Sequence, residues 1–312
     1  MRQIATAMSL MLAAALVATG CGRASETPAR GKELRVLTST FPMTLFTRAV
    51  AAGREGIVVE SMLPGSMGCP HDYVLTPEDM RRIADADVLV ANGLGMENYL
   101  GAPVERANPH ITVLDSSKGV AGRLRMTPEE GAGDEHGHGE FNPHLFASPR
   151  TAAAVVRNIA AELATVDPAG AEVYRRNAEA YAAKLDALAD ELAAAGKKLR
   201  LRKIVTQHAV FDYLARDAGL EIVAVIEEMP GQEPSAAQML DIVKRIKAGG
   251  AAAVFTEPQY PPKVAETIAK EAGVPVAGLD PVASGPDDAP LDYYETVMRR
   301  NLDTLKKTLG VK

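Results

Sequence analysis

Hydrophobic residues occur along this chain in short runs that alternate with amphipathic segments, and the same rhythm appears twice. Short β-rich runs occupy 34–38, 57–62, 87–92 and 111–115 in the first half. Runs of the same kind occupy 203–207, 221–225, 251–256 and 274–279 in the second half. Strand–helix alternation of this kind is typical of parallel sheets covered by helices. The pattern predicts an α/β fold with two lobes, each a mostly four-stranded parallel sheet with flanking helices.

Several of the helices between these runs carry local start and stop signals. Thr76 can cap a helix that begins at Pro77, and Asp79 follows the cap at the spacing of a capping box. Gly219 and Gly273 stand where a helix needs a left-handed residue at its C-terminus.

An alanine-rich segment between the two halves predicts one long helix. After Pro168 its apolar residues recur at alternating spacings of four and three, which is one face of a helix. These residues are Tyr174, Ala178, Tyr181, Leu185, Leu188 and Leu192. The helix should end at Gly196 and run on the order of 40 Å at about 1.5 Å per residue. We interpret it as a rigid spine over 169–199 between lobes at 33–168 and 200–312; a surface helix inside one large domain is the alternative.

The N-terminus has the layout of an export signal. Arg2 precedes a short apolar run, and small residues lead into Cys21. This run is shorter than the roughly 20 residues that span a bilayer, so a cleaved signal peptide over 1–20 is favoured over a residual membrane anchor. Cys21 after small residues resembles a bacterial lipobox. We therefore expect a lipidated Cys21, a tether over 21–32, and a membrane-anchored protein in the periplasm or at the cell surface.

Composition narrows the class of ligand. The net charge is −6 and no stretch forms a basic patch, which argues against a nucleic-acid partner. Aromatic residues are only 4% and tryptophan is absent, so stacking on sugars or bases is disfavoured and a small ligand fits better.

The stretch 127–142 differs from the rest of the chain. It holds four glycines, five acidic residues and the histidines His136 and His138, without lysine or arginine. A segment of this composition cannot bury enough apolar surface to fold alone. It is either a weak capture element for a cation or a solvated loop without a role.

Three histidines and one carboxylate share a setting, because each follows a predicted strand. They are His71, His144, His208 and Asp280. Ligands of open α/β sheets bind outside the carboxyl ends of the strands, so a cleft between two lobes would bring these side chains together. Three imidazoles and a carboxylate suit a tetrahedral, zinc-like site. Each histidine alone is equally consistent with an ordinary hydrogen-bonding role.

At this point the sequence resembles the metal-receptor class of ABC-transporter solute-binding proteins. The motifs that carry the resemblance are Pro70-His71, Asn142-Pro143-His144, 206–213, 229–235 and 279–281, within a region from about 34 to 309. The resemblance implies two α/β lobes joined by one long helix, a metal ion in the interlobe cleft, modest lobe motion, and a monomer that delivers the ion to an ABC permease in the cytoplasmic membrane.

The same resemblance makes His71, His144, His208 and Asp280 the metal ligands. A histidine at the third position is typical of zinc receptors and a glutamate of manganese receptors, so His208 favours Zn²⁺ over Mn²⁺. Ligand softness agrees, because imidazole suits zinc and carboxylate suits manganese.

Cys69 departs from the family pattern. Its thiolate, two residues from His71, could join or replace a ligand, or it could be an ordinary buried thiol. A ligating histidine usually donates its second N–H to an oxygen, and Asp72, Asn142 and Glu257 are candidates for that role.

The leading hypothesis is a non-catalytic zinc receptor of an ABC importer. A manganese or iron receptor of the same family is the nearest alternative, and a metal-dependent hydrolase and a surface adhesin are alternatives from other classes. A hydrolase is disfavoured because four protein ligands would close the site and the chain has no His-Glu-x-x-His helix.

Overall fold

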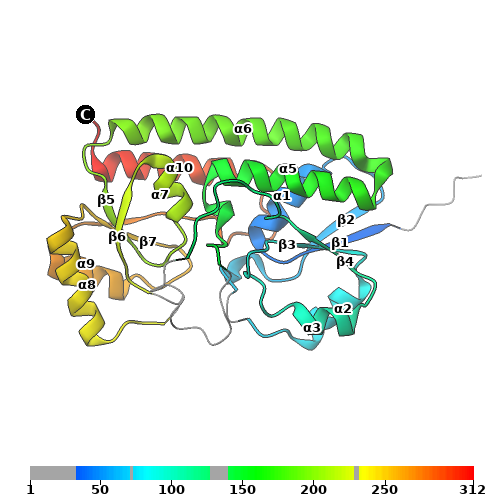
Figure 1. Ribbon diagram of the computed structural model, residues 1–312, viewed down its shortest axis with the longest axis horizontal. Coiled ribbons are helices and arrows are strands. Elements are labelled where there is room, and N and C mark those ends of the chain that lie inside the picture. Colours follow the sequence, from blue (N-terminus) through cyan, green and yellow to red (C-terminus); the bar gives the residue numbers. More distant parts are fainter. Residues whose placement is uncertain (1–32, 71–72, 127–139, 228–231) are drawn as a thin grey trace, which may run out of the picture. The chain divides into compact units, whose positions relative to one another are not determined.

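Two parallel sheets form the framework of the computed structural model, which describes residues 33–70, 73–126, 140–227 and 232–312 (Figure 1). The first sheet has the order β2-β1-β3-β4. Its strands are β1 (Leu34–Thr38), β2 (Ile57–Ser61), β3 (Val88–Ala91) and β4 (Thr112–Asp115). All of its pairings are parallel. After β1 the chain adds β2 on one side of it, and then adds β3 and β4 on its other side. The direction of strand addition therefore reverses between β1 and β3.

The second sheet repeats this topology with the order β6-β5-β7-β8. Its strands are β5 (Lys203–Thr206), β6 (Glu221–Val225), β7 (Val254–Thr256) and β8 (Val276–Gly278). They also pair in parallel. The order reverses between β5 and β7, and such a reversal opens a crevice at the carboxyl ends of the strands. The predicted pair of four-stranded parallel sheets is confirmed.

Each sheet carries helices on both faces, which explains why its strands are nearly continuous apolar runs. The helices of the first half are α1 (Phe41–Ala51), α2 (Pro77–Asp85), α3 (Gly101–Ala107) and α5 (Pro149–Val166). Those that follow are α6 (Ala171–Lys198), α7 (Asp212–Ala218), α8 (Ala236–Gly249), α9 (Lys263–Ala272) and α10 (Tyr293–Leu309). In β1, Val36 belongs to the core shared with α1 and α5, whereas its neighbour Leu37 packs with α2 and α3. In β7, Val254 packs with α8 and α9, whereas Phe255 lies in the first core. Three short 3₁₀ turns in the described residues are η1 (Gly65–Met67), η2 (Leu145–Ala147) and η3 (Pro168–Gly170).

The helix signals in the sequence are confirmed. Thr76 and Asp79 form a capping box in front of α2, with Pro77 as the first helical residue. Gly219 and Gly273 end α7 and α9 with φ of 65° and 76°, a conformation that glycine adopts without steric cost.

The long helix α6 spans 28 residues and runs across both halves (Figure 1). It contacts α1 and α5 of the first half and α7 and α10 of the second. All six residues of the predicted apolar face are buried. The prediction that the helix ends at Gly196 is wrong, since α6 continues to Lys198. Gly196 serves close packing instead, because a Cβ there would lie 1.9 Å from the carbonyl oxygen of Ala218 in α7.

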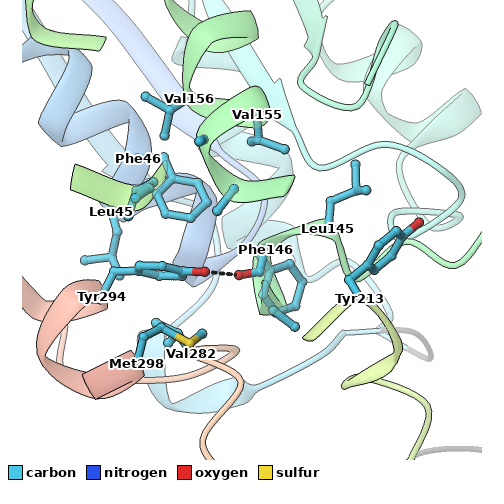
Figure 2. Packing of buried hydrophobic residues seen from close by; sticks show 14 of the residues in the cluster. Leu45, Phe46, Leu145, Phe146, Val155, Val156, Tyr213, Val282, Tyr294 and Met298 are labelled. Atoms are coloured by element: carbon cyan, nitrogen blue, oxygen red, sulfur yellow. Dashed lines mark hydrogen bonds between the residues drawn. The ribbon is translucent and has the colours of Figure 1, made fainter. Parts of the chain in front are cut away.

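A second connection between the halves lies around the start of α10, and the sequence analysis did not foresee it. Tyr294 donates a hydrogen bond to the carbonyl oxygen of Phe146 at 2.7 Å and its ring packs edge-on against Phe46 (Figure 2). Upstream of α10, the backbone N–H of Gly285 donates to Gly65 at 2.8 Å. One core cluster therefore continues from the first sheet through α6 to α10. The lobe limits at residues 168 and 200 stay a prediction.

Among the described residues, none of the helices is both long and apolar enough to span a membrane. The predicted signal peptide, Cys21 and the tether lie outside the described residues, as do His71, Asp72, His136 and His138.

Candidate metal centre

His144 lies directly in front of η2, in a loop that is fixed by Asn142. The Asn142 Oδ1 accepts the backbone N–H of His144 at 2.9 Å and lies 2.8 Å from its Nδ1. On its other side, the Asn142 amide donates to the carbonyl oxygen of Ala209 at 2.8 Å. Since an amide oxygen only accepts, this pairing places the proton on Nδ1 of His144. Asn142 therefore orients His144 and links its loop to the residue that follows His208.

His208 lies just beyond β5, and Glu257 lies just beyond β7, so the pair flanks the strand reversal of the second sheet. Nδ1 of His208 donates to Oε1 of Glu257 at 2.6 Å, and both side chains are buried. The second oxygen of Glu257 accepts from Nε2 of Gln259 at 2.7 Å. Nε2 of His208 is buried without a hydrogen-bond partner among the described residues. An unpartnered buried nitrogen is costly, which makes it a candidate ligand for an ion.

Cys69 completes a cluster with these two histidines. One ligand atom each from Cys69, His144 and His208 lie within 4.8 Å of one another. The two imidazole rings are 5.3 Å apart at an angle of 77°. The three residues come from distant parts of the chain: the β2–α2 connection, the loop before η2 and the end of β5. The fold thus brings together side chains from both halves at one point.

The electrostatics of the cluster favour a bound cation. Burial alone would lower the pKa of His208, but the carboxylate of Glu257 and the neighbouring Cys69 raise this pKa to about 10. Burial raises the pKa of the Cys69 thiol, and His208 opposes this effect. The buried carboxylate of Glu257 therefore favours positive charge at His208, and a divalent cation would bind there in place of protons.

Asp280 lies beyond β8, as its place in the sequence predicts, but it is not part of this three-residue cluster. Its Oδ1 accepts the backbone N–H of Val282 at 2.8 Å. Its side chain lines a pocket of about 390 Å³ together with Glu257 and Arg300. Burial raises the pKa of Asp280, and the hydrogen bond from Val282 opposes this effect. The assignment of Asp280 as a ligand stays a prediction.

Glu97, which was not among the residues predicted from the sequence, lies at the strand reversal of the first sheet. Oε1 of Glu97 accepts from the Ser39 hydroxyl at 2.5 Å and from the Asn92 N–H at 2.6 Å, while Oε2 accepts from the Gly93 N–H at 3.0 Å. Burial raises the pKa of Glu97 to about 7 although these hydrogen bonds favour the carboxylate. The Asn92 amide in turn donates to the carbonyl oxygen of Pro143 at 2.9 Å. Glu97 therefore supports the loop that carries His144. The sequence does carry one signal for Glu97, since this acidic residue follows a buried strand in a loop that contains Gly93 and Gly95.

Comparison with known proteins agrees with this fold. The ZnuA family, described as zinc-uptake complex component A, periplasmic, matches residues 36–308. The high-affinity zinc uptake system protein ZnuA of Bacillus subtilis is 32% identical over 95% of both chains. The zinc-binding lipoprotein AdcA of Streptococcus pneumoniae serotype 4 is 32% identical over 96% of this chain, which spans 60% of that protein's length.

A solved structure gives the same picture. The solute-binding protein FpvC of Pseudomonas aeruginosa in complex with Mn²⁺ is 32% identical and covers 89% of this chain and 98% of its own, with a TM-score of 0.76. The fold is thus that of a two-lobed solute-binding protein. This chain belongs to the ZnuA family. The resemblance that the sequence motifs indicated is confirmed.

Proposed function

We propose that this protein is an extracytoplasmic receptor of an ABC importer, which captures Zn²⁺ between its two lobes and delivers it to a membrane permease. One observation carries the proposal: His144 and His208, which belong to different halves of the fold, have ring nitrogens within 4.8 Å of each other and of Cys69. In each histidine an oxygen acceptor holds Nδ1. The metal-ligating atom of each ring would then be Nε2, and Nε2 of His208 is buried without a hydrogen-bond partner among the described residues.

The proposed ligands are the imidazoles of His71, His144 and His208 and an anionic fourth ligand. The sequence analysis assigns that fourth position to Asp280. His71 follows Cys69 by two residues in the chain, which supports its place beside the cluster. Glu257 and Asn142 hold the rings of His208 and His144, and Asp72 is proposed for the same role toward His71. His136 and His138 are proposed as a weak capture element.

Zinc is the proposed cargo, and manganese is the alternative. Nitrogen and sulfur donors favour zinc, whereas manganese prefers oxygen donors. The names of the relatives support zinc, and FpvC was solved with Mn²⁺. The relatives named as zinc-uptake and zinc-binding proteins support a transport component and not an enzyme. Anchoring through a lipid on Cys21, a monomeric state and a cytoplasmic-membrane permease as partner complete the proposal.

The test is native mass spectrometry of the full chain after equilibration with equal Zn²⁺ and Mn²⁺. We expect one zinc per chain, and a shift toward manganese in His208→Glu. His110→Glu is the matched control, because His110 is exposed and should leave the preference unchanged. Manganese in the wild-type chain would overturn zinc as the cargo. A chain that binds neither ion would overturn the receptor function.

A further inference from the structure

We infer that Cys69, and not Asp280, is the anionic ligand that joins the histidines around the captured ion. This inference rests on the proposed function, since it names the ligand that selects the cargo at that same site. It gives the receptor a mixed imidazole–thiolate site, with a preference for thiophilic ions such as Zn²⁺ over Mn²⁺.

The first support is distance. Tetrahedral zinc with Zn–N bonds of about 2.0–2.1 Å and a Zn–S bond of about 2.3 Å places its ligand atoms about 3.3–3.6 Å apart. The ligand atoms of Cys69, His144 and His208 already lie within 4.8 Å of one another. A contraction of about 1.5 Å or less would therefore close this set around an ion. Asp280 does not belong to this group of described residues.

The second support is how the Cys69 loop is held against the second half. Gly68 has a φ of 81°, and a Cβ at this position would lie 3.2 Å from the side chain of Gln259. Gln259 donates to Glu257, and Glu257 accepts from His208. The Cys69 loop thus passes close to Gln259, whose hydrogen bonds lead through Glu257 to the ring of His208. Among the described residues, Nε2 of His208 is buried without a hydrogen-bond partner, so this nitrogen is available to an ion bound beside Cys69.

The third support is that Asp280 has another role. Its Oδ1 accepts the N–H of Val282, a buried β-branched residue with a φ of 64°. A β-branched residue in this conformation is strained and needs its surroundings to hold it there. The backbone of Asp280 is fixed in addition by Asn301, which donates to its carbonyl oxygen at 2.6 Å. Asp280 therefore stabilises a strained turn, on the wall of a pocket that it shares with Glu257 and Arg300.

Charge balance agrees with a thiolate ligand. On binding, the ion displaces the thiol proton of Cys69 and any proton on Nε2 of His208 to solvent, and Zn–S and Zn–N bonds form. The dication then lies beside two negative charges, the thiolate and the buried carboxylate of Glu257. A buried ion is tolerated only when its charge is compensated in this way.

X-ray absorption at the zinc edge tests the inference directly. The full chain carries Cys21→Ser, so that Cys69 is its only thiol, and is loaded with one equivalent of Zn²⁺. We expect a sulfur shell at about 2.3 Å beside nitrogen at about 2.0–2.1 Å. Adding Cys69→Ser should abolish the sulfur shell while zinc still binds through the histidines. Adding Asp280→Asn instead should leave the shell unchanged.

Other results would overturn the inference in distinguishable ways. Bound zinc with only nitrogen and oxygen neighbours would exclude Cys69 and leave the proposed function standing. A sulfur shell that persists in Cys69→Ser would assign the sulfur to a methionine. A parent chain that binds no zinc would remove the proposed function itself. Circular dichroism of each variant confirms that the chain is folded, so that loss of the shell reports on coordination.

Discussion

At the scale of single residues, the candidate site is defined by what holds each imidazole in place. The oxygens of Asn142 and Glu257 fix Nδ1 of His144 and His208, which determines the nitrogen that faces an ion. Glu257 is held in place especially firmly, because its side chain is completely buried and both of its oxygens accept hydrogen bonds. A partner of this kind tunes a metal ligand without touching the metal.

We predict that Glu257→Gln weakens zinc binding about 10- to 100-fold, the range typical of lost acceptors behind metal-ligating histidines. Competition with a chelator of known affinity measures the change. Glu266→Gln, on the exposed side of α9, is the matched control and should bind like the wild type. Equal affinities of the two variants would show that Glu257 does not support the ligand.

The sequence was informative about residues whose role depends on local context. The caps at Thr76, Gly219 and Gly273 follow from neighbouring positions, and each is present. The histidines could be placed at strand ends because parallel strands end at one edge of a sheet. Cys69 could be proposed as a possible ligand only from its place two residues before His71. The role of Glu97 could not be predicted, because it depends on loops that meet across the fold.

At the scale of elements, helix junctions are secured by specific contacts that strand–helix periodicity does not reveal. Arg54, just after α1, donates to Asp167 at the α5–α6 junction at 2.9 Å and 3.1 Å. The hydroxyl of Tyr174 in α6 donates to the same carboxylate at 2.5 Å. These contacts fix the corner where α6 begins. The hydrogen bond from Arg54 is the largest cause of a lowered pKa at Asp167.

The lowered pKa of Asp167 gives this corner a pH dependence. A carboxyl whose pKa is lower in the folded state stabilises the fold above its ordinary pKa of 3.8, and this stability is lost as pH falls through the folded value. We predict that Asp167→Asn lowers the free energy of unfolding by about 1–3 kcal/mol at pH 7. Urea unfolding should show this difference shrinking below about pH 4.

The control for this experiment is Asp190→Asn. Asp190 pairs with Arg150 on the surface of α6 and is largely exposed. Exposed pairs contribute at most about 1 kcal/mol. If Asp190→Asn lost as much stability as Asp167→Asn, the special role of the α5–α6 corner would be refuted.

Gly196 marks a close approach between α6 and α7. From the sequence alone it was predicted to end α6. It lies inside α6, where glycine is normally unfavourable by about 0.5–1 kcal/mol relative to alanine. We predict that Gly196→Ala nevertheless destabilises the protein by about 1–3 kcal/mol, because the new Cβ would overlap the backbone of Ala218. Gly249→Ala in α8 is the contrast, since a Cβ there would make ordinary contacts from 3.4 Å. Gly249→Ala should be neutral or stabilising in urea unfolding, and the reverse order would contradict this account.

At the scale of the whole described fold, the halves are tied together by α6, by the start of α10 and by the contacts of the His144 loop with α7. The long helix α6 was predictable from its apolar face. The contacts that Gly285 and Tyr294 make with the first half could not be predicted. A local sequence pattern carries no information on which distant surface a segment covers. The shared core around Phe46, Phe146 and Tyr294 must be disturbed if the lobes rotate apart (Figure 2). Disturbing packed aromatic residues is costly.

We therefore predict that zinc binding changes the separation of the lobes only slightly. Small-angle X-ray scattering of the chain with and without zinc should give the same radius of gyration within error. A clear decrease on binding would indicate hinge closure and would contradict the continuous core as a restraint on motion.

The central claim is that one ion is bound jointly by both halves. Anomalous diffraction at the zinc edge from zinc-loaded crystals tests it most directly. We predict a single strong peak at bonding distance from Nε2 of both His144 and His208. A peak bound to residues of one half only, or one in the pocket lined by Asp280 and Arg300, would contradict the claim.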